Sequence, residues 1–557
     1  MADEPGNFWG DTGQGTTGDA AHKKTSKALH LHRSLHNLAK GGALRKLITE
    51  TPMANPIYDS LFGIHAGKDT TFLHLIDGMT LSHESFLGMA AQIANLTFDL
   101  GLRPGDRVAV RVEKSAEALA IYAACVQAGL VFLPLNTAYT ADELTYFVEN
   151  SAAALIICDA RKADNLATLA CRTRARIETL NGDGSGSLMG QAHALPRHFA
   201  TVARKSDDLA ALLYTSGTTG RSKGAMLTQE NLLSNAETLV DEWQFSATDV
   251  LLHALPIFHT HGLFVATNVM LAVGGSMIFL PGFDKDQIIE MMPQATTMMG
   301  VPTFYTRLLD DTRFTSELTR HMRLFISGSA PLLAETHSAF QTRTGHRILE
   351  RYGMTETNMN TSNPYTGERR AGTVGFPLPG VELRITDATS GKTLPQGEIG
   401  QIELRGPNVF KGYWQMPEKT AAELRSDGFF ITGDLGKIDT DGYVHIVGRN
   451  KDLIISGGYN IYPKEIEQVL DAQPGVLESA VIGVPHPDFG ETVVGVLVQT
   501  PGERIEADAI MESLNLTLPR FKHPRSLVVI DTLPRNTMGK VQKNVLRAQY
   551  AKMFSAD

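Results

Sequence analysis

The sequence predicts an α/β protein whose main part is built on doubly wound parallel sheets, followed by a β-rich unit and a separate C-terminal domain. Two observations predict this class. Strands alternate with helices over residues 53–200 and again over 249–350, and such alternation is typical of a parallel sheet covered by helices on both faces. After Arg370 the pattern changes to short strands separated by close Gly and Pro turns.

The individual elements follow from the same pattern. We expect a helix over residues 83–100 with Ser82 as its N-cap, because a serine hydroxyl there accepts a hydrogen bond from a first-turn amide. The two alternating regions should also contain a helix at 117–128 and strands at 107–112, 130–133, 154–158, 277–280, 298–300 and 324–327. Strands at 382–386 and 400–405 begin the β-rich unit, and residues 452–557 carry helices and strands of their own.

Size, charge and cysteine usage exclude several classes of protein. The 557 residues suffice for several domains of about 100–200 residues each. A formal net charge of -9 argues against a general nucleic-acid binder, which is usually basic. The sequence has no apolar run of about 18 residues, so we expect no membrane span. The cysteines, Cys125, Cys158 and Cys171, fit no metal motif and favour reduced thiols in a cytoplasmic protein.

Residues 1–52 differ from the rest of the chain, and we interpret them as a disordered N-terminal extension. The first 21 residues are rich in Gly, Thr and Asp, and residues 27–48 are basic with leucines at helical spacing. Two interpretations stay open: a targeting or docking arm, or a non-essential leader with Met53 as the true start. The expected domains are then 53–450, which carries the chemistry described below, and a mobile domain at 451–557.

The strongest local motif is a Gly- and hydroxyl-rich segment at residues 214–224, which reads Tyr-Thr-Ser-Gly-Thr-Thr-Gly-Arg-Ser-Lys-Gly. Glycines let backbone N–H groups approach a phosphate, hydroxyls donate further hydrogen bonds, and Lys223 adds positive charge. It is not a Walker loop, because Gly220 is followed by Arg-Ser-Lys. The motif therefore predicts a phosphate site, and a flexible surface loop is the alternative.

Three further segments suggest a nucleotide or metal site, but each is weak evidence when taken alone. Thr355 and Glu356 follow a tight turn and could hold Mg²⁺ through a hydroxyl and a carboxylate. Asp434 precedes the Gly-Arg pair at 448–449, and a carboxylate that accepts both ribose hydroxyls is a common way to hold a nucleotide. Lys540 follows a glycine near the C-terminus.

Taken together and in this order, these motifs resemble those of the AMP-forming adenylate superfamily, which contains acyl-CoA synthetases, peptide-synthetase adenylation domains and luciferases. The resemblance covers residues 53–554. It implies a large N-terminal domain of two doubly wound sheets plus a β-barrel, and a small mobile α+β domain that begins at the hinge residue Lys451. It also implies an AMP-forming acid–thiol ligase that uses ATP, Mg²⁺ and CoA.

The resemblance assigns roles residue by residue. The β- and γ-phosphates would be bound by Thr215, Ser216, Gly217, Thr218, Thr219, Gly220 and Lys223. The adenine would be held between Gly328, Ser329, Ala330 and Pro331 on one side and Tyr352 on the other, and Gly353 and Met354 would also belong to the ATP site. The remaining assignments are Thr355 at the α-phosphate, Glu356 at Mg²⁺, Asp434 and Arg449 at the ribose, and Gly457, Gly458 and Tyr459 at the pantetheine channel of CoA.

Lys540 would bridge the substrate carboxylate and the α-phosphate. Attack of a carboxylate on a phosphate brings two anions together, and a preorganised ammonium stabilises the charge that builds in the transition state. The segment around Lys540 also resembles the site of reversible lysine acetylation in bacterial relatives. We therefore expect a lysine acetyltransferase and deacetylase as candidate partners, since acetylation removes the charge.

Polar residues in the predicted acyl pocket indicate which carboxylic acid is the substrate, because a fatty or aryl acid would need apolar walls there. Arg307 lies in a helix that the family places along the acyl pocket, and its guanidinium could pair with a second substrate carboxylate. The alternative is that Arg307 is a solvated helix residue or pairs with Asp310 or Asp311. The segments around these positions resemble bacterial malonyl-CoA synthetases. By carry-over, the pocket would contain Arg307, His259, Thr260, His261, Ser329 and Met359.

The resemblance thus implies that malonate, and also methylmalonate, is joined to CoA through an acyl-adenylate. Alternatives are another short carboxylic acid, a stand-alone adenylation enzyme that loads a carrier protein, an oxygen-dependent luciferase, or a non-enzymatic binding protein. Because no fused carrier domain follows in this sequence, CoA is the expected acceptor. A binding protein would be expected to lose Lys540 or Glu356, and the sequence keeps both.

Overall fold

The computed structural model describes residues 54–215, 222–536 and 539–554. Its first sheet has six strands in the order β6-β5-β3-β4-β7-β8, all parallel except β8, which runs antiparallel to β7. The strands are β3 (Arg107–Arg111), β4 (Val131–Pro134), β5 (Leu155–Cys158), β6 (Arg176–Thr179), β7 (Leu209–Thr215) and β8 (Lys223–Thr228). The strand pattern expected for this region is confirmed, with ends that shift by one or two residues.

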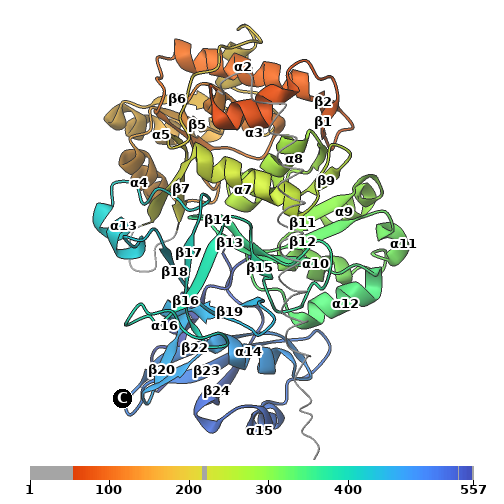
Figure 1. The fold of residues 1–557 in the computed structure, drawn as a ribbon, viewed down its shortest axis with the longest axis vertical. Helices are drawn as coiled ribbons and strands as arrows, with labels where there is room; N and C mark the ends of the chain where they lie inside the picture. Colours follow the sequence, from red (N-terminus) through yellow and green to blue (C-terminus); the bar gives the residue numbers. More distant parts are fainter. Residues whose placement is uncertain (1–53, 216–221, 537–538, 555–557) are drawn as a thin grey trace, which may run out of the picture. The chain divides into compact units, whose positions relative to one another are not determined.

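The helices α2 to α5 of this region begin at hydroxyl and carboxylate caps. The hydroxyl of Ser82 accepts a hydrogen bond from the Ser85 amide at 3.2 Å, which confirms the predicted cap of α2 (His83–Asp99). Ser115 caps α3 in the same way, and α2 and α3 pack on each other (Figure 1). The helices are α3 (Ala116–Gln127), α4 (Ala141–Ser151), α5 (Ala160–Thr173) and α6 (Ser187–Ala192).

A second sheet has nine strands in the order β15-β14-β13-β12-β11-β9-β10-β1-β2. Its central strands are parallel, while β2, β14 and β15 run antiparallel to their neighbours. The strands are β1 (Thr71–His74), β2 (Thr80–Ser82), β9 (Val250–His253), β10 (Ser276–Phe279), β11 (Thr297–Gly300), β12 (Leu324–Ser327), β13 (Leu349–Met354), β14 (Asn358–Ser362) and β15 (Phe376–Pro377). The helices along this stretch of the chain are α7 (Gln229–Glu242), α8 (Asn268–Val273), α9 (Lys285–Met291), α10 (Pro302–Leu309), α11 (Ser316–Thr319) and α12 (Ala334–Thr344).

The β-rich unit is a four-stranded antiparallel sheet in the order β16-β17-β18-β19, where the resemblance implied a barrel. Its strands are β16 (Glu382–Thr386), β17 (Gly400–Arg405), β18 (Phe430–Ile438) and β19 (Val444–Arg449), and α13 (Pro417–Glu423) lies between β17 and β18 in sequence. The predicted bounds of β16 and β17 agree with those of the structure. The register pairs Asp434 directly with Arg449.

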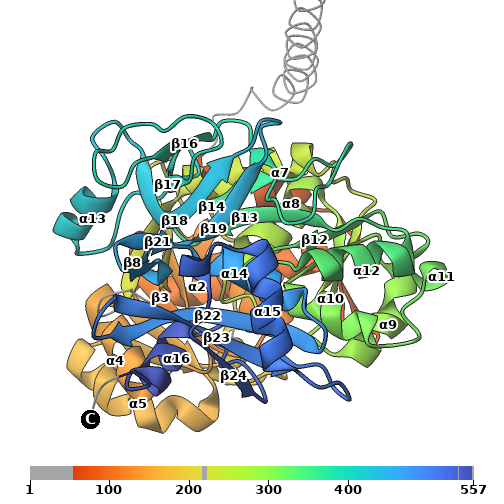
Figure 2. The same cartoon turned by 90° about the horizontal axis from the view of Figure 1, so that it is seen from below.

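Residues after 453 form a sheet of five strands with its own core on both faces. Strand alternation sends Val481 into a cluster with α14 and α15, and its neighbour Ile482 into a cluster with α16 (Figure 2). The elements are β20 (Ile454–Ser456), β21 (Tyr459–Ile461), β22 (Val476–His486), β23 (Gly490–Gln499), β24 (Ser526–Ile530), α14 (Pro463–Asp471), α15 (Ala507–Thr517) and α16 (Lys543–Tyr550).

The predicted fold class is thereby confirmed: two largely parallel sheets, a smaller antiparallel sheet and a small C-terminal α+β part. The proposed extension at 1–52 and its basic helix lie outside the described residues. The domain bounds at 450 and 451 and the mobility of the small domain stay predictions. Within the described part of the chain, no helix is long and apolar enough to cross a membrane.

Candidate active site

Tyr352, Asp434 and Arg449 come together from three strands. The Tyr352 hydroxyl, on β13, donates a 2.5 Å hydrogen bond to Asp434 Oδ2 on β18. Arg449 Nε, at the end of β19, lies 2.8 Å from the other carboxylate oxygen. Asp434 is buried, and its negative charge raises the pKa of Arg449. The predicted ribose pair is thus adjacent to the aromatic ring predicted for the adenine.

Glu356 is a buried carboxylate beside the phosphate motif. Its Oε1 accepts hydrogen bonds from the Tyr413 hydroxyl at 3.1 Å and the Thr215 hydroxyl at 3.5 Å. Burial raises the pKa of Glu356, while the positive charge of Lys223 and the Tyr413 hydroxyl oppose that rise. The geometry joins Thr215, at the end of β7, to the predicted metal residue, although the two are 141 positions apart in sequence.

Lys223 begins β8 and is held by a second carboxylate. Its Nζ lies 3.3 Å from Glu423 Oε1, 3.3 Å from the Tyr413 hydroxyl and 4.4 Å from the centroid of the Tyr413 ring. The Tyr413 hydroxyl also lies 2.7 Å from Glu423 Oε2, so its single hydrogen is shared between Glu356 and Glu423. Sequence reasoning missed Tyr413 and Glu423. The predicted phosphate residues Ser216, Gly217, Thr218, Thr219 and Gly220 lie outside the described residues.

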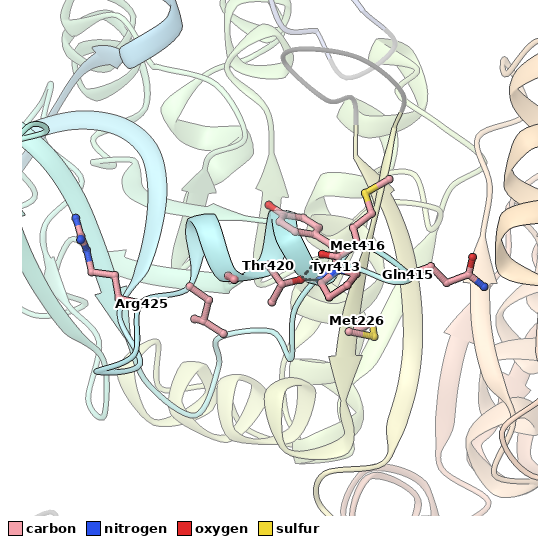
Figure 3. A pocket seen from close by; sticks show the side chains of 9 residues that line it. Met226, Tyr413, Gln415, Met416, Thr420 and Arg425 are labelled. Atoms are coloured by element: carbon pink, nitrogen blue, oxygen red, sulfur yellow. Dashed lines mark hydrogen bonds between the residues drawn. The ribbon is translucent and has the colours of Figure 1, made fainter.

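An open pocket of about 430 Å³ is lined in part by Tyr413 (Figure 3). Its walls are mostly apolar and include Met226 of β8, Met416 and Leu424, and its polar lining residues include Gln415, Thr420 and Arg425. Because the ring of Tyr413 is part of this wall and its hydroxyl contacts Glu356, the pocket adjoins the predicted phosphate region.

The segment after β12 packs its bare backbone against a buried arginine. A Cβ atom added to Gly328 would lie 2.3 Å from Cζ of Arg351, so only glycine leaves room for that guanidinium. Ser329 follows with a φ of 71°, and Ala330 and Pro331 complete the predicted adenine segment. Gly353 is equally confined, because a Cβ there would lie 2.0 Å from the carbonyl oxygen of Asn358. Met354 ends the strand, and Thr355 begins the turn after it.

Arg351 is another residue to which sequence reasoning gave no role. Its side chain is 4% exposed, and its Nε and Nη2 have no hydrogen-bond partner among the described residues. Burial lowers the pKa of Arg351 to about 9. A buried cation without a partner is costly, so the geometry favours an anionic ligand beside it. The available signal was a charged residue inside the buried strand β13.

His259, Thr260 and His261 lie near this cation. The Ser329 hydroxyl lies 3.2 Å from His261 Nδ1, while His261 Nε2 and the Thr260 hydroxyl are buried without partners among the described residues. Burial, and then the charge of Arg351, holds the pKa of His261 well below its ordinary value. Burial and the charge of Lys540 lower the pKa of His259 to about 3. Both histidines are therefore neutral at physiological pH.

Met359 and Arg307 complete the predicted acid pocket. Met359 is buried in β14, where its register partner is Gly353. Arg307 lies in the last turn of α10 and is exposed, and its Cζ is 5.6 Å from the ring centroid of Phe283. Asp311, one alternative partner, pairs instead with Lys285 and Arg313. Within the described residues, no carboxylate forms an ion pair with Arg307.

The charges of the site residues described above shift the pKa of Lys540. Lys540 is exposed as a residue, yet desolvation of its ammonium, and then the charge of Arg449, lower its pKa to about 8, against the opposing charges of Asp434 and Glu356. The preceding glycine meets α10: a Cβ on Gly539 would lie 3.7 Å from the Thr303 hydroxyl. The structure therefore brings Lys540 to the predicted nucleotide residues.

The predicted CoA segment forms a tight hairpin between β20 and β21. Gly457 and Gly458 both have positive φ, 56° and 84°, which a two-residue turn between twisted strands requires. Tyr459 stacks on Phe521 with ring centroids 4.7 Å apart, and the Gly457 amide donates to the Phe489 carbonyl. Lys451 lies in the short turn of Asn450–Asp452, between the antiparallel sheet and this hairpin. The hinge and CoA roles stay predictions.

The residues present fit a magnesium ion that is bound partly by the protein and partly by the substrate. Among the described residues, no group of three or more His, Cys, Asp or Glu side chains could hold a metal ion by itself. Glu356 offers one buried carboxylate next to the hydroxyl of Thr215. Mg²⁺ is usually bound through one or two carboxylates together with substrate phosphates, so this donor set is compatible with it.

Comparisons with known proteins agree with this geometry. Residues 65–414 match the family model described as AMP-binding enzyme, and residues 465–540 match that of the AMP-binding enzyme C-terminal domain. Feruloyl-CoA synthase of Amycolatopsis sp. is 36% identical to this chain. The match covers 85% of this chain and 94% of the length of that protein. Malonate–CoA ligase of Arabidopsis thaliana is 33% identical over 80% of this chain and 78% of its own.

Among solved structures, ATP-bound MatB from Rhodopseudomonas palustris is 57% identical in sequence. The match covers 90% of this chain and 100% of that chain, with a TM-score of 0.88. The apo crystal structure of the same protein gives the same identity and coverage and a TM-score of 0.79. The arrangement described here is therefore more similar to the ATP-bound structure.

Proposed function

Because the chain belongs to the family of AMP-binding enzymes, we propose that it is a malonyl-CoA synthetase, an AMP-forming acid–thiol ligase. It converts malonate, ATP and CoA into malonyl-CoA, AMP and diphosphate through a malonyl-adenylate. The similarity to MatB and to the malonate–CoA ligases supports the class of reaction and the acid. The observation that carries the choice of acid is the buried Arg351 beside neutral His261: its Nε and Nη2 have no hydrogen-bond partner among the described residues.

The first half-reaction joins two anions. One malonate carboxylate oxygen forms a bond to the α-phosphorus, and the bond to the bridging oxygen breaks as diphosphate leaves. Lys540 would neutralise the charge that builds on the phosphoryl oxygens, and Thr355 would donate to them. Tyr352, Asp434 and Arg449 would hold the nucleoside, with Asp434 already oriented by two hydrogen-bonding neighbours.

Mg²⁺ would neutralise phosphate charge when it is bound between Glu356 and the nucleotide. The protein's own contribution is the buried position of Glu356, which Tyr413 and Thr215 orient. Lys223 would turn from Glu423 toward the β- and γ-phosphates, because a triphosphate offers it more charge than one carboxylate.

The acid pocket favours a small dicarboxylate over the aryl acid of feruloyl-CoA synthase. Arg351, Arg307, His261 and Ser329 would bind the distal carboxylate, and Thr260 and Met359 would limit a substituent at C2. An aryl or fatty chain there would leave Arg351 buried without an anion, which opposes its binding. Methylmalonate adds one methyl group and is the second substrate we expect.

In the second half-reaction, the CoA thiol sulfur forms a bond to the acyl carbon and AMP leaves. We infer that rotation of the small domain about Lys451 withdraws Lys540 and brings the Gly457–Gly458 hairpin to the thiol. The exposed position of this hairpin is compatible with that role.

We infer a cytoplasmic location and regulation by acetylation. All the cysteines are free thiols, with Cys171 exposed, which fits a reducing compartment. Lys540 is exposed and therefore open to a lysine acetyltransferase, and loss of its charge would slow adenylation strongly. Mass spectrometry before and after acetyltransferase treatment, followed by activity measurement, tests this. An unmodified Lys540, or full activity after its acetylation, would refute it.

The proposed chemistry is tested without CoA by exchange of labelled diphosphate into ATP. Exchange that requires malonate, and that octanoate and ferulate do not support, is the expected result. Exchange with ferulate and not with malonate would contradict the choice of acid. No exchange with any acid would contradict adenylate formation itself.

A further inference from the structure

Lys114 joins the two large sheets by contacting a histidine at the end of a strand in the other sheet. Lys114 follows β3 of the six-stranded sheet, and His253 is the last residue of β9 in the nine-stranded sheet. The lysine Nζ lies 2.9 Å from His253 Nδ1 and 2.8 Å from the His253 carbonyl oxygen. It also lies 4.2 Å from the centroid of the Phe279 ring. The side chain therefore has defined partners on three sides.

These contacts determine which nitrogen of His253 carries the proton. His253 Nε2 lies 2.8 Å from the Gly262 carbonyl oxygen, which only accepts hydrogen bonds, so Nε2 must donate. Nδ1 then accepts from Lys114. Burial, and next the charge of Lys114, holds the pKa of His253 well below its ordinary value, so the ring is neutral. Burial also lowers the pKa of Lys114, but even a neutral amine has two N–H groups for its two acceptors.

Gly262 connects this pair to the acid pocket. It is the second residue of η3 (His261–Thr267), a π-helix, which is a rare geometry that is frequent at functional sites. The Thr267 hydroxyl also donates to the Gly262 carbonyl, at 2.9 Å. A Cβ on Gly262 would lie 2.1 Å from the Pro256 carbonyl oxygen, so the backbone has no room to move there. The neighbour His261 meets Ser329 at the proposed pocket.

The location of the contact in the two sheets supports a functional role. The next two strands in sequence lie on opposite sides of β3 in its sheet, and the same holds for β9. Ligands of α/β proteins bind outside the carboxyl ends of strands at such reversals of strand order. A small cavity of about 70 Å³ lies there, and Lys114 and Phe258 are among its lining residues. Phe258 begins the segment that carries His259, Thr260 and His261.

We propose that Lys114 is a positioning residue for the acid pocket: it holds His253 in the Nε2–H tautomer, which fixes the Gly262 carbonyl and, through it, the place of His261. The proposal rests on the proposed function, because that function makes His261 a wall of the malonate site. Lys114 does not touch the substrate. Its loss should therefore change the affinity for the acid and leave the nucleotide site intact.

The kinetic test compares Lys114→Met and Lys114→Gln with a matched control, Lys162→Met, on the exposed face of α5. Loss of one hydrogen bond in Lys114→Met should raise KM for malonate about three- to tenfold, with KM for ATP within about twofold of the parent. Lys114→Gln keeps an N–H donor, so its KM for malonate should lie between those of the parent and Lys114→Met. The control should match the parent. Equal rises in both KM values, or no change in either, would overturn the proposal.

A spectroscopic measurement is independent of activity. Nitrogen-15 labelling of histidine reports the tautomer of each ring, and the signal of His253 is assigned by its absence in His253→Gln. In the parent protein we expect His253 as the neutral Nε2–H form between pH 6 and about 9. In Lys114→Met the signal should move toward a mixture of tautomers. A charged or Nδ1–H His253 in the parent would overturn the proposal, even if the variants did not fold.

The kinetic and spectroscopic measurements distinguish failure of this proposal from failure of the proposed function. If the parent activated another acid and not malonate, the proposed function would fail, and the KM comparison with that acid would still test Lys114. If malonate were activated and the KM values did not separate, the function would stand and the role of Lys114 would fall.

Discussion

The hydroxyl of Tyr352 donates a 2.5 Å hydrogen bond to Asp434, across two sheets and 82 positions of sequence. The bond fixes the ring predicted for the adenine relative to the carboxylate predicted for the ribose. Asp434 makes its second contact with Arg449 on the adjacent strand. The nucleoside site is therefore organised before a nucleotide binds, which lowers the cost of binding.

Removal of this hydroxyl should weaken ATP binding. Tyr352→Phe keeps the ring but leaves Asp434 with one partner fewer, so we expect KM for ATP to rise about tenfold, the effect of one hydrogen bond to a charged group. KM for malonate should stay within about twofold. Tyr443→Phe, which loses a bond from the residue before β19 to the Glu368 carbonyl, is the matched control. An unchanged KM for ATP in Tyr352→Phe would count against the nucleoside assignment.

Loss of the Lys540 ammonium should separate the two half-reactions. Lys540→Ala should slow adenylation by about 10²–10³-fold, the scale of one key electrostatic donor. Thioester formation from synthetic malonyl-adenylate and CoA should change much less. Both rates are measured in single turnovers, with Lys392→Ala, on the exposed Lys392, as the control. A nearly normal adenylation rate in Lys540→Ala would rule out the assigned role.

The pH dependence of adenylation should report the same lysine. Its pKa of about 8 means that the cation is present below that pH and is lost above it. Because kcat/KM reflects the free enzyme, kcat/KM for ATP in diphosphate exchange should fall as pH rises through 8. Exchange omits CoA, so titration of its thiol does not interfere.

Lys540→Arg provides the control for this pH profile. A guanidinium stays charged over the whole range, so the variant should be slower but should lose the decline above pH 8. The same decline in parent and variant would show that another group titrates.

The two arginines of the acid pocket should affect malonate selectively. Arg307→Gln and Arg351→Gln should each raise KM for malonate about 10- to 100-fold, the effect of a lost charge-assisted hydrogen bond. KM for ATP should change little. Arg320→Gln, at an exposed position near α11, is the control. If Arg307→Gln matched the parent and Arg351→Gln did not, Arg307 would be the solvated helix residue that was the alternative.

A buried carboxyl in the small domain should make stability depend on pH. Burial raises the pKa of Asp471 to about 6, so the folded state holds its proton more tightly than the unfolded state. Stability from this group is therefore present at low pH and decreases as pH rises through about 6. Asp471→Asn should raise the melting temperature at pH 8 relative to the parent, and by less at pH 5. A larger gain at pH 5 would reverse the sign and contradict the assignment.

Local patterns predicted most of the fold. The helix at 83–99 and the strands at 324–327, 382–386 and 400–405 follow from periodicity and turn residues within a few positions. The nucleotide motifs were equally local, since Thr355 and Glu356, or Gly448 and Arg449, are neighbours in sequence. The π-helix at His261–Thr267 was not predictable in this way, because its geometry depends on packing against His253 and Pro256.

Contacts between distant residues account for what sequence reasoning missed. Lys114 and His253 are 139 positions apart, and no spacing rule links them. Arg351 stood next to a predicted site residue, but only the three-dimensional structure shows that its Nε and Nη2 are buried and find no partner in the part of the chain that the structure describes. Arg307 was predicted as the pocket cation, and the structure leaves its side chain exposed and over Phe283.

The central claim is that this enzyme activates malonate with ATP and transfers it to CoA. The most direct measurement is AMP and diphosphate formation in the presence of CoA, with malonate, methylmalonate, acetate, octanoate, benzoate and ferulate as acids. We predict the highest kcat/KM with malonate, followed by methylmalonate, and little activity with the monocarboxylates. Activity with octanoate, benzoate or ferulate but not with malonate would contradict the dicarboxylate pocket built around Arg351.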